Sequence, residues 1–183
     1  MRNTSVSVRR TRVVESFKNV AETIGPLEPG MALFAVSRGQ WSMVDALCYV
    51  LDQVGPSVVS LWPRTVAIGK GDILTRLRLD KRVTFCRLII NSGDEKANHV
   101  LVAEWQALYG AASVVHCRTH AKIATIEGGG LRFLLRGSLN LGVGSRFEQF
   151  DLTEGGADFA LIREIEEGLP VVQGGSQARM GRW

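Results

Sequence analysis

The chain has 183 residues, of which 45% are hydrophobic and 22% are charged, and its formal net charge is +4. This length and composition are typical of one globular domain with a real core. No apolar run approaches the ~20 residues that cross a bilayer, which excludes a membrane-spanning protein, and no signal-peptide pattern opens the chain. Three cysteines in apolar surroundings indicate reduced thiols. We therefore expect a soluble, cytoplasmic protein whose mild positive charge favours a polyanionic partner.

Hydrophobic periodicity predicts a regular alternation of helices and strands along the chain. Residues 11–24 place apolar side chains at helical spacing and predict an amphipathic helix. Ser42 is a candidate N-cap for the second helix, and Gly55 is its expected stop. The predicted elements after the first helix are a strand at 31–36, a helix at 41–54, a strand at 57–62, a helix at 70–80, a strand at 83–90, a helix at 94–109, strands at 112–116, 119–127 and 131–136, and a helix at 157–167.

Strands that alternate with helices at this spacing predict an α/β fold with a sheet covered by helices on both faces. The sheet should be mixed, because the glycines at 128–130 are too few for a parallel crossover and must close a hairpin. The chain shows no internal repeat. We expect one domain over residues 1–168, followed by a flexible tail at 169–183 that is rich in Gly, Gln and Arg.

A histidine and a lysine occupy alternate positions of the strand predicted at 119–127. His120 and Lys122 would therefore point to the same face of the sheet. The next predicted strand would return beside it and bring Ser138 and Asn140 to the same end. An imidazole, an ammonium, a hydroxyl and an amide together suit attack on a phosphodiester. Ser138 and Asn140 could also cap a short helix, which is compatible with binding a phosphate.

These residues resemble the signature of the phospholipase D superfamily, which consists of His-x-Lys, an Asp shortly after the Lys, and then Gly-Ser-x-Asn. The chain matches each position except that of the Asp, where it has Glu127. In the family this acidic residue is mainly structural. The resemblance covers residues 118–151 and extends more loosely to compact members from bacteria and their phages. It implies a single-domain, phospholipase D-like fold in which a mixed sheet lies between helices.

The resemblance also implies a stepwise mechanism. His120 would attack phosphorus and form a phosphohistidine. Lys122 and Asn140 would hold the non-bridging oxygens, and Ser138 would add a hydrogen bond. Because side chains supply the positive charge, no metal and no other cofactor are expected.

Two parts of such a site lie outside the signature. The first is a carboxylate that holds the other ring nitrogen of the nucleophile; Glu148 is our first choice and Asp151 our second, although Glu148 could instead pair with Arg146. The second is a general acid for the leaving oxygen. The chain carries one copy of the signature and no histidine before His99. We therefore expect a homodimer in which two copies of the nucleophile complete one site.

Three arginines are candidates for substrate binding. Arg38 and Arg64 follow the first two predicted strands, and ligands gather at the carboxyl ends of strands in α/β sheets. Arg118 would share the face of the nucleophile if the strand is regular that far. Exposed loop arginines are the alternative for each. Trp41 and Trp62 lie beside the first two loops and could stack on bases, although anchoring in the core is the stronger expectation.

His116 and Cys117, close to the nucleophile, raise the possibility of a metal site. On a strand Cys117 would face away from both neighbouring histidines, which prevents joint ligation. The sequence has no CxxC pattern and no second histidine cluster. We therefore expect no metal here.

The predicted function is that of a metal-independent phosphodiesterase of phospholipase D type, in particular an endonuclease that acts on DNA ahead of RNA. Nucleic acid is preferred over lipid because the chain is small and basic, lacks an export signal and lacks an apolar interfacial helix. The alternative is a non-catalytic nucleic-acid-binding or assembly module that keeps the fold, which the change to Glu127 favours. Lipid hydrolysis or phosphatidyl transfer is a third possibility.

Overall fold

The computed structural model describes residues 11–16, 19–63, 80–92, 99–138 and 147–170. Within these ranges the chain forms an eight-stranded sheet and flanking helices. The strands are β1 (Thr11–Ser16), β2 (Ala32–Ser37), β3 (Ser57–Trp62), β4 (Val83–Asn91), β5 (Val114–Cys117), β6 (Ile123–Gly128), β7 (Leu131–Gly137) and β8 (Glu148–Glu154). The helices are α1 (Val20–Ile24), α2 (Met43–Val54), α4 (His99–Tyr109), α5 (Gly156–Gly168) and the short 3-10 helix η2 (Ala111–Ser113).

The sheet is mixed, as predicted. Its strand order is β1-β2-β8-β7-β6-β3-β4-β5. The pairs β1–β2, β3–β4 and β4–β5 are parallel, whereas the four central pairs are antiparallel. The predicted hairpin is confirmed, because β6 and β7 pair directly through the glycine turn. At that turn Gly129 and Gly130 have positive φ angles of 58° and 78°, which glycine adopts without strain.

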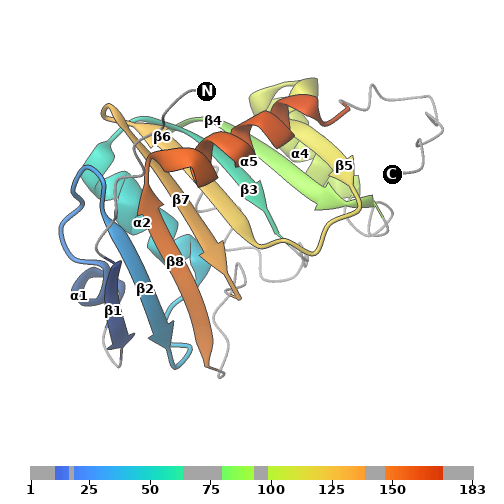
Figure 1. The fold of residues 1–183 in the computed structure, drawn as a ribbon. Helices are drawn as coiled ribbons and strands as arrows, with labels where there is room; N and C mark the ends of the chain where they lie inside the picture. Colours follow the sequence, from blue (N-terminus) through green and yellow to red (C-terminus); the bar gives the residue numbers. More distant parts are fainter. Residues whose placement is uncertain (1–10, 17–18, 64–79, 93–98, 139–146, 171–183) are drawn as a thin grey trace, which may run out of the picture.

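Helices cover both faces of the sheet, again as predicted (Figure 1). On one face α1, α2 and α4 pack over a continuous apolar core; among its fully buried members are Leu47, Leu61, Trp105, Phe133 and Phe150. On the other face α5 crosses the sheet (Figure 1). A small cluster of Trp62, Ile89 and Val115 lies on that face, and Leu169 packs against it. Leu169, which the sequence assigned to the tail, therefore belongs to the packed domain.

The predicted helix at 41–54 is confirmed because its start and stop signals are local. Ser42 caps α2 with a capping box, in which its hydroxyl accepts from the Asp45 amide and the Asp45 carboxylate accepts from the Ser42 amide. The helix ends at Gly55, where a φ of 75° suits glycine. Trp41, just before the helix, packs edge to face against Phe150 at 4.7 Å between ring centroids.

The predicted helix at residues 11–24 is wrong. This stretch contains strand β1, which pairs in parallel with β2, and the separate short helix α1. Val13 and Val14 are β-branched and favour a strand, where they point to opposite faces. Asn19 then caps α1 by accepting from the Glu22 amide at 2.9 Å. The apolar residues therefore appeared at helical spacing because the pattern combined residues of strand β1 with residues of helix α1.

Two further strand predictions need correction. The strand predicted from residue 119 starts only at Ile123, so residues 118–122 form the connection between β5 and β6. Strand β8 was not predicted at all. Its sequence alternates apolar Phe150 and Leu152 with polar Gln149 and Asp151, a period of two that could have revealed it.

Several predictions fall on residues outside the described ranges. They are residues 70–79 of the helix predicted at 70–80, the first part of the helix at 94–109, and most of the tail. The part of the helix that is described, α4, ends at Tyr109 before Gly110, as expected. In the described part of the chain, no helix has both the length and the apolar character needed to cross a membrane.

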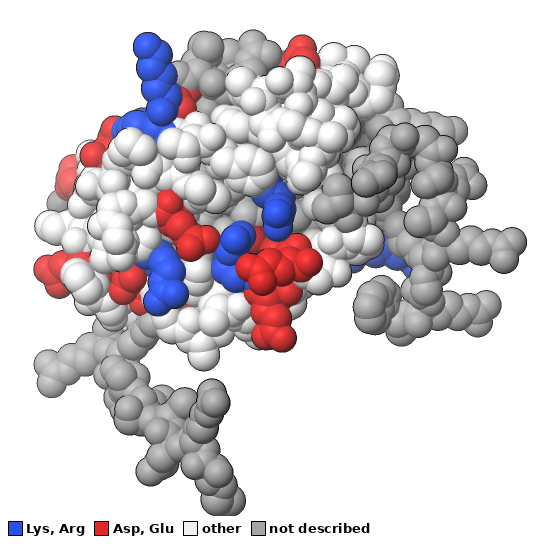
Figure 2. Space-filling model, turned by 90° about the horizontal axis from the view of Figure 1, so that it is seen from above, with Lys and Arg blue, Asp and Glu red and all other residues white. Residues whose placement is uncertain are grey.

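Charges on the described surface are mixed. Figure 2, which views the molecule from the upper side of Figure 1, shows acidic and basic side chains next to one another. Two arginines, Arg12 and Arg82, have partners within the fold. Arg12 donates to the carbonyl oxygen of Thr23 at 2.9 Å, and Arg82 forms ion pairs with Asp80 and Asp52. These arginines stabilise the fold in addition to contributing charge.

Candidate active site

The predicted site residues that the structure describes, Arg38, Arg118, His120, Lys122, Ser138 and Glu148, lie at or next to strand ends on one edge of the sheet, the lower edge in Figure 1. Strands β2, β3 and β7 end there, while β6 and β8 begin there. The pairing register proves the alignment: Ser37 pairs with Glu148, Trp62 with Ile123, and Ile123 with Arg136. Carboxyl ends of parallel strands and the starts of their antiparallel neighbours therefore meet where His120, Lys122 and Ser138 lie, the usual place for a ligand in an α/β sheet.

Lys122 and Ser138, from the two parts of the signature, are in direct contact. The Lys122 Nζ donates to the Ser138 carbonyl oxygen at 2.7 Å. The backbone reinforces this contact, because the Gly137 amide donates to the Lys122 carbonyl at 3.2 Å. The half-buried lysine is thus held just beyond the last rung of the β6–β7 hairpin. An ammonium has three donors, and among the described residues only the Ser138 carbonyl takes one of them.

Ser138 also connects β7 to β8. Its hydroxyl donates to the Glu148 carboxylate and accepts from the Gln149 amide at 2.9 Å. Its own amide donates to the Gln149 carbonyl at 2.9 Å. A hydroxyl bonded to a carboxylate is a charge-assisted interaction, stronger than a neutral one. The predicted catalytic serine is therefore fixed from both sides, and Lys122, Ser138 and Glu148 form one connected cluster.

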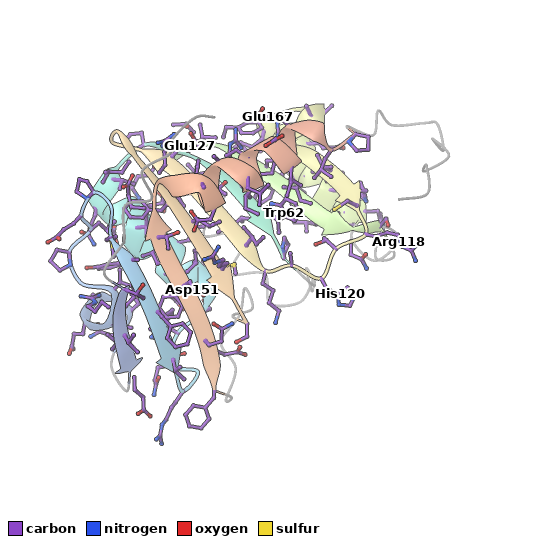
Figure 3. The ribbon with its side chains drawn as sticks, in the orientation of Figure 1. Trp62, Arg118, His120, Glu127, Asp151 and Glu167 are labelled. Atoms are coloured by element: carbon purple, nitrogen blue, oxygen red, sulfur yellow. The ribbon has the colours of Figure 1, made fainter. Side chains whose placement is uncertain are left out.

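Glu148 therefore contacts the serine, whereas the sequence suggested a contact with the nucleophilic histidine. No hydrogen bond joins Glu148 to His120 among the described residues. The second candidate, Asp151, lies in the middle of β8, where it pairs with Phe34 and Arg136. It is thus set back from the edge that carries the site (Figure 3). Of the two carboxylates, Glu148 has the position to act within the cluster.

His120 is held differently. It lies on the connection between β5 and β6, and its side chain is exposed and points away from the sheet (Figure 3). Because residues 118–122 are not a strand, the alternation that placed His120 and Lys122 on one face does not apply. A local bond shapes this connection, in which the Ala121 amide donates to the Thr119 hydroxyl at 3.0 Å. The imidazole thus stands at the correct edge, with an open approach from solvent.

The arginine candidates are placed unequally. Arg38 follows β2 at the site edge, where it pairs with Glu15 at 3.5 Å and lies over the Phe147 ring at 5.0 Å from its centroid. Arg118 follows β5, is exposed, and projects from the same connection as the histidine (Figure 3). Arg64 and the predicted catalytic Asn140 lie outside the described residues.

Both tryptophans near these loops are core residues, as was the stronger expectation. Trp41 is 3% exposed. Trp62 is 6% exposed and donates from Nε1 to the buried Glu166 carboxylate at 2.7 Å. Neither ring is available for stacking. Among the described residues, the exposed aromatic side chain at this edge is Phe147. Sequence reasoning missed it because nothing in its neighbourhood distinguishes an exposed phenylalanine from a buried one.

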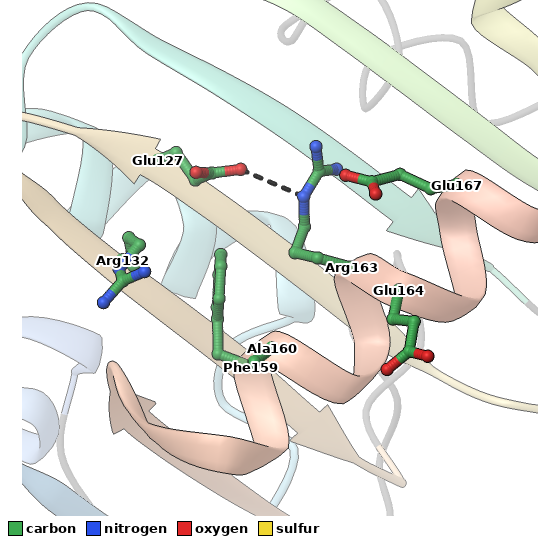
Figure 4. A pocket seen from close by; sticks show the side chains of 7 residues that line it. All are labelled: Glu127, Arg132, Phe159, Ala160, Arg163, Glu164 and Glu167. Carbon is green, nitrogen blue, oxygen red and sulfur yellow. Dashed lines mark ion pairs between the residues drawn. The ribbon is translucent and has the colours of Figure 1, made fainter.

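Glu127, the departure from the signature, lies at the opposite end of β6 from Lys122 (Figure 3). Its carboxylate pairs with Arg163 Nε of α5 at 3.1 Å. Arg163 in turn pairs with the buried Glu166 at 2.6 Å. Figure 4 shows the open hollow of about 350 Å³ around this pair. The hollow is lined by Glu127, Arg132, Phe159, Ala160, Arg163, Glu164 and Glu167. Glu127 therefore attaches α5 to the sheet and is remote from the cluster.

Other reactive groups do not add to the site. Burial raises the pKa of the Cys117 thiol, which keeps it protonated and a poor nucleophile at neutral pH. Burial, with a smaller effect of the Glu166 charge, raises the pKa of Cys86 as well. Among the described residues, no group of three or more His, Cys, Asp or Glu side chains is arranged to hold a metal ion.

Comparisons with protein-family models and with curated proteins found no match for this chain. The interpretation of the site therefore depends on its residues and their geometry. Those residues combine a fixed ammonium, a fixed hydroxyl and an exposed imidazole at one sheet edge, a set that can bind an anionic oxygen and offer a nitrogen nucleophile beside it.

Proposed function

We propose that this protein is a metal-independent phosphodiesterase of phospholipase D type, and that its substrate is nucleic acid. The observation that carries the proposal is the 2.7 Å contact between Lys122 Nζ and the Ser138 carbonyl. This contact joins the two parts of the signature at the carboxyl-end edge of a mixed sheet. The register of the β6–β7 hairpin brings the two positions together, and the contact fixes the ammonium where it can meet an anionic oxygen.

In the proposed reaction His120 attacks phosphorus in line. A nitrogen–phosphorus bond forms while the bond to the leaving oxygen breaks, and a second histidine gives its proton to that oxygen. The same second histidine then takes a proton from water, whose oxygen displaces His120 and restores the free enzyme. Lys122 stabilises charge on the non-bridging oxygens throughout. The bond between the Ser138 hydroxyl and Glu148 fixes the residue whose carbonyl Lys122 binds. Asn140 is proposed to add an amide donor.

The need for a second histidine favours a homodimer. The chain has three histidines, and the other two lie on α4 (His99) and within β5 (His116). While His120 is bonded to phosphorus it cannot also act as the general acid. A symmetric pair of chains supplies two copies of His120. The exposed position of this side chain supports such an arrangement, because a second chain or a substrate can approach it directly.

A specific observation also supports the alternative, a non-catalytic nucleic-acid-binding or assembly module. In the described part of the chain no carboxylate binds His120, although a nucleophilic imidazole benefits from a carboxylate that fixes its tautomer. A binding module needs Lys122 and the arginines but not a poised histidine. The two functions differ in whether a covalent intermediate forms, so a cleavage assay separates them.

The decisive experiment measures hydrolysis of DNA and of an activated phosphodiester in EDTA by the wild type, by His120→Ala and by His99→Ala. His99 is an exposed histidine on α4 and serves as the matched control. We expect cleavage in EDTA by the wild type and by His99→Ala, and none by His120→Ala. Activity that disappears with chelator would contradict the mechanism. DNA binding without any cleavage would establish the alternative.

A further inference from the structure

Phe147 is a large aromatic side chain that is exposed next to the candidate active site. It is 64% exposed and directly precedes Glu148, whose carboxylate binds Ser138. Among the large exposed hydrophobic side chains of the described residues, it is the aromatic one; the others are Val13, Val58, Val100, Leu108, Leu161 and Ile165. Singly exposed hydrophobic side chains are common; what distinguishes Phe147 is that it is aromatic and lies next to the candidate site.

One face of the Phe147 ring is already supported. The Arg38 guanidinium lies over it at 5.0 Å from the ring centroid. Arg38 is itself held by Glu15 at 3.5 Å, and its amide donates to Gln40 Oε1 at 3.1 Å. The ring is therefore braced from the β2 side, and its exposed part faces solvent. Proteins stack unpaired bases on aromatic rings and on arginine guanidinium planes, and the Arg38–Phe147 pair offers both groups at one place.

The distance to the site suits a neighbouring nucleotide. Phe147 stands at the start of β8 and Lys122 at the start of β6, with β7 between them. Gly137 lies between Lys122 and Phe150 in the register, so Phe147 is two strands across and three residues farther along β8. Two strand spacings and three residues together correspond to about 14 Å between the two backbones, part of which the long Lys122 and Phe147 side chains can span. A phosphate bound by Lys122 would thus carry its flanking nucleotide toward Phe147, along the same edge of the sheet.

We propose that Phe147, supported by Arg38, stacks on an unpaired base beside the bound phosphate, which makes single-stranded nucleic acid the substrate class. This inference rests on the proposed function, because it takes the phosphate to lie at Lys122. A base within a duplex already stacks on both faces and offers neither to Phe147. An unpaired base offers a face at no such cost, and stacking accepts any base because each has a π-face.

The test measures binding by fluorescence anisotropy, with the full chain carrying His120→Ala so that cleavage cannot interfere. The probes are a single-stranded thymine oligonucleotide, an abasic strand of the same length and charge, and a duplex. We expect the thymine strand to bind about 10-fold more tightly than the abasic strand. Phe147→Ala should abolish this difference, whereas Phe147→Trp should keep it. Leu161→Ala, which removes a 55% exposed side chain on α5, should leave all affinities unchanged.

Equal affinity for the thymine and abasic strands would overturn the inference, as would a base-dependent difference that survives Phe147→Ala. Binding to vesicles of anionic phospholipid that depends on Phe147, with no base-dependent binding, would also overturn it in favour of a lipid surface. The cleavage assay is read separately. If the protein cleaves in EDTA but Phe147 has no role, the proposed function stands and the stacking inference is wrong. If binding depends on the base through Phe147 but no cleavage occurs, the stacking inference stands and the catalytic proposal is wrong.

Discussion

Lys122 and His120 are two positions apart in the sequence, yet the structure holds them in different ways. Lys122 is half-buried and bonded to a serine carbonyl that is itself fixed to β8. His120 is exposed on a connection, with its side chain directed to solvent. Both residues precede β6, but the Lys122 carbonyl still accepts from the Gly137 amide of β7, whereas His120 lies two residues farther from the strand. One half of the site is thus set by strand pairing before any ligand arrives, whereas the other is open to be positioned by substrate or by a second chain.

This contrast explains which parts of the proposed chemistry are preorganised. Electrostatic stabilisation works best when donors are fixed in advance, because no reorganisation is needed during the reaction. The cluster of Lys122, Ser138 and Glu148 meets that condition. A nucleophile must instead approach phosphorus in line, and its final position depends on how the substrate is bound. Variants of the two halves should therefore differ in how they divide their effects between activity and stability.

The largest expected effect is that of His120→Ala, which should reduce cleavage by more than about 1000-fold, because the nucleophile is lost. The free energy of unfolding should stay within about 0.5 kcal/mol of the wild type, since the side chain is exposed and its loss breaks no packing. Activity and urea denaturation of the same preparation provide both values. A large loss of stability would show that His120 is part of the fold, which contradicts the comparison.

Mixing wild type with His120→Ala sharpens the same comparison. If a second chain supplies the general acid, mixed dimers cannot complete turnover. Activity should then fall more steeply than the wild-type fraction after subunit exchange. Strict proportionality after confirmed exchange, or full activity in a monomer by light scattering, would exclude a shared site.

Lys122→Gln should have the second largest effect, a loss of about 100-fold in kcat/KM, as expected when one fixed donor to a developing charge is removed. Lys122→Arg should not restore activity, because a planar guanidinium does not reproduce the contact of the ammonium with the Ser138 carbonyl. Kinetics on an activated diester and on DNA measure both variants. An Arg variant with wild-type activity would mean that charge alone matters and that the observed position does not.

Ser138→Ala should act on stability as well as activity, in contrast to His120→Ala. It removes the hydroxyl that joins the Glu148 carboxylate to the Gln149 amide, and we expect a cost of about 1 to 2 kcal/mol in the free energy of unfolding. Ser60→Ala is the matched control, because the buried Ser60 hydroxyl has no hydrogen-bond partner in the described part of the chain. Its removal should cost little. Equal costs for the two variants would show that the hydroxyl bonds of Ser138 do not support the edge.

The two halves of the site also differ in how far the sequence could predict them. The hairpin that carries Ser138 was predictable because three glycines mark its turn, and α2 because Ser42, Asp45 and Gly55 mark its ends. Those signals are local. The start of β6 depends on its pairing with β3 and β7, which no local pattern reveals, so the geometry around His120 was predicted wrongly.

The remaining errors have a similar cause. Apolar residues at 11–24 fitted a helix, but parallel pairing with β2 made the first of them a strand. Strand β8 carried a visible alternation that was overlooked, and with it the contact between Glu148 and Ser138. Of the signature residues that the structure describes, His120, Lys122 and Ser138 share an edge, whereas Glu127 lies at the other end of β6. The signature contained no information on the exposure of Phe147, because exposure depends on what the rest of the fold leaves uncovered.

The smallest expected effect is a change in stability with pH at Asp80. It tests whether an ion pair remote from the site contributes to the fold without affecting activity. A hydrogen bond from the Arg82 side chain holds the pKa of Asp80 below its ordinary value of 3.8. A carboxyl group with a lowered pKa in the folded state stabilises the fold above its unfolded pKa, and this contribution is lost as pH falls through the folded pKa. Asp80→Asn should therefore be less stable than wild type at pH 7, and the difference should shrink below about pH 4. Urea denaturation across this range measures the difference.

Asp52→Asn, which removes the more exposed partner of Arg82, should cost less. Because both aspartates are remote in the fold from Lys122 and His120, neither variant should change kcat/KM at pH 7. A fall in kcat/KM with unchanged stability would show that this ion pair supports the site and not only the fold.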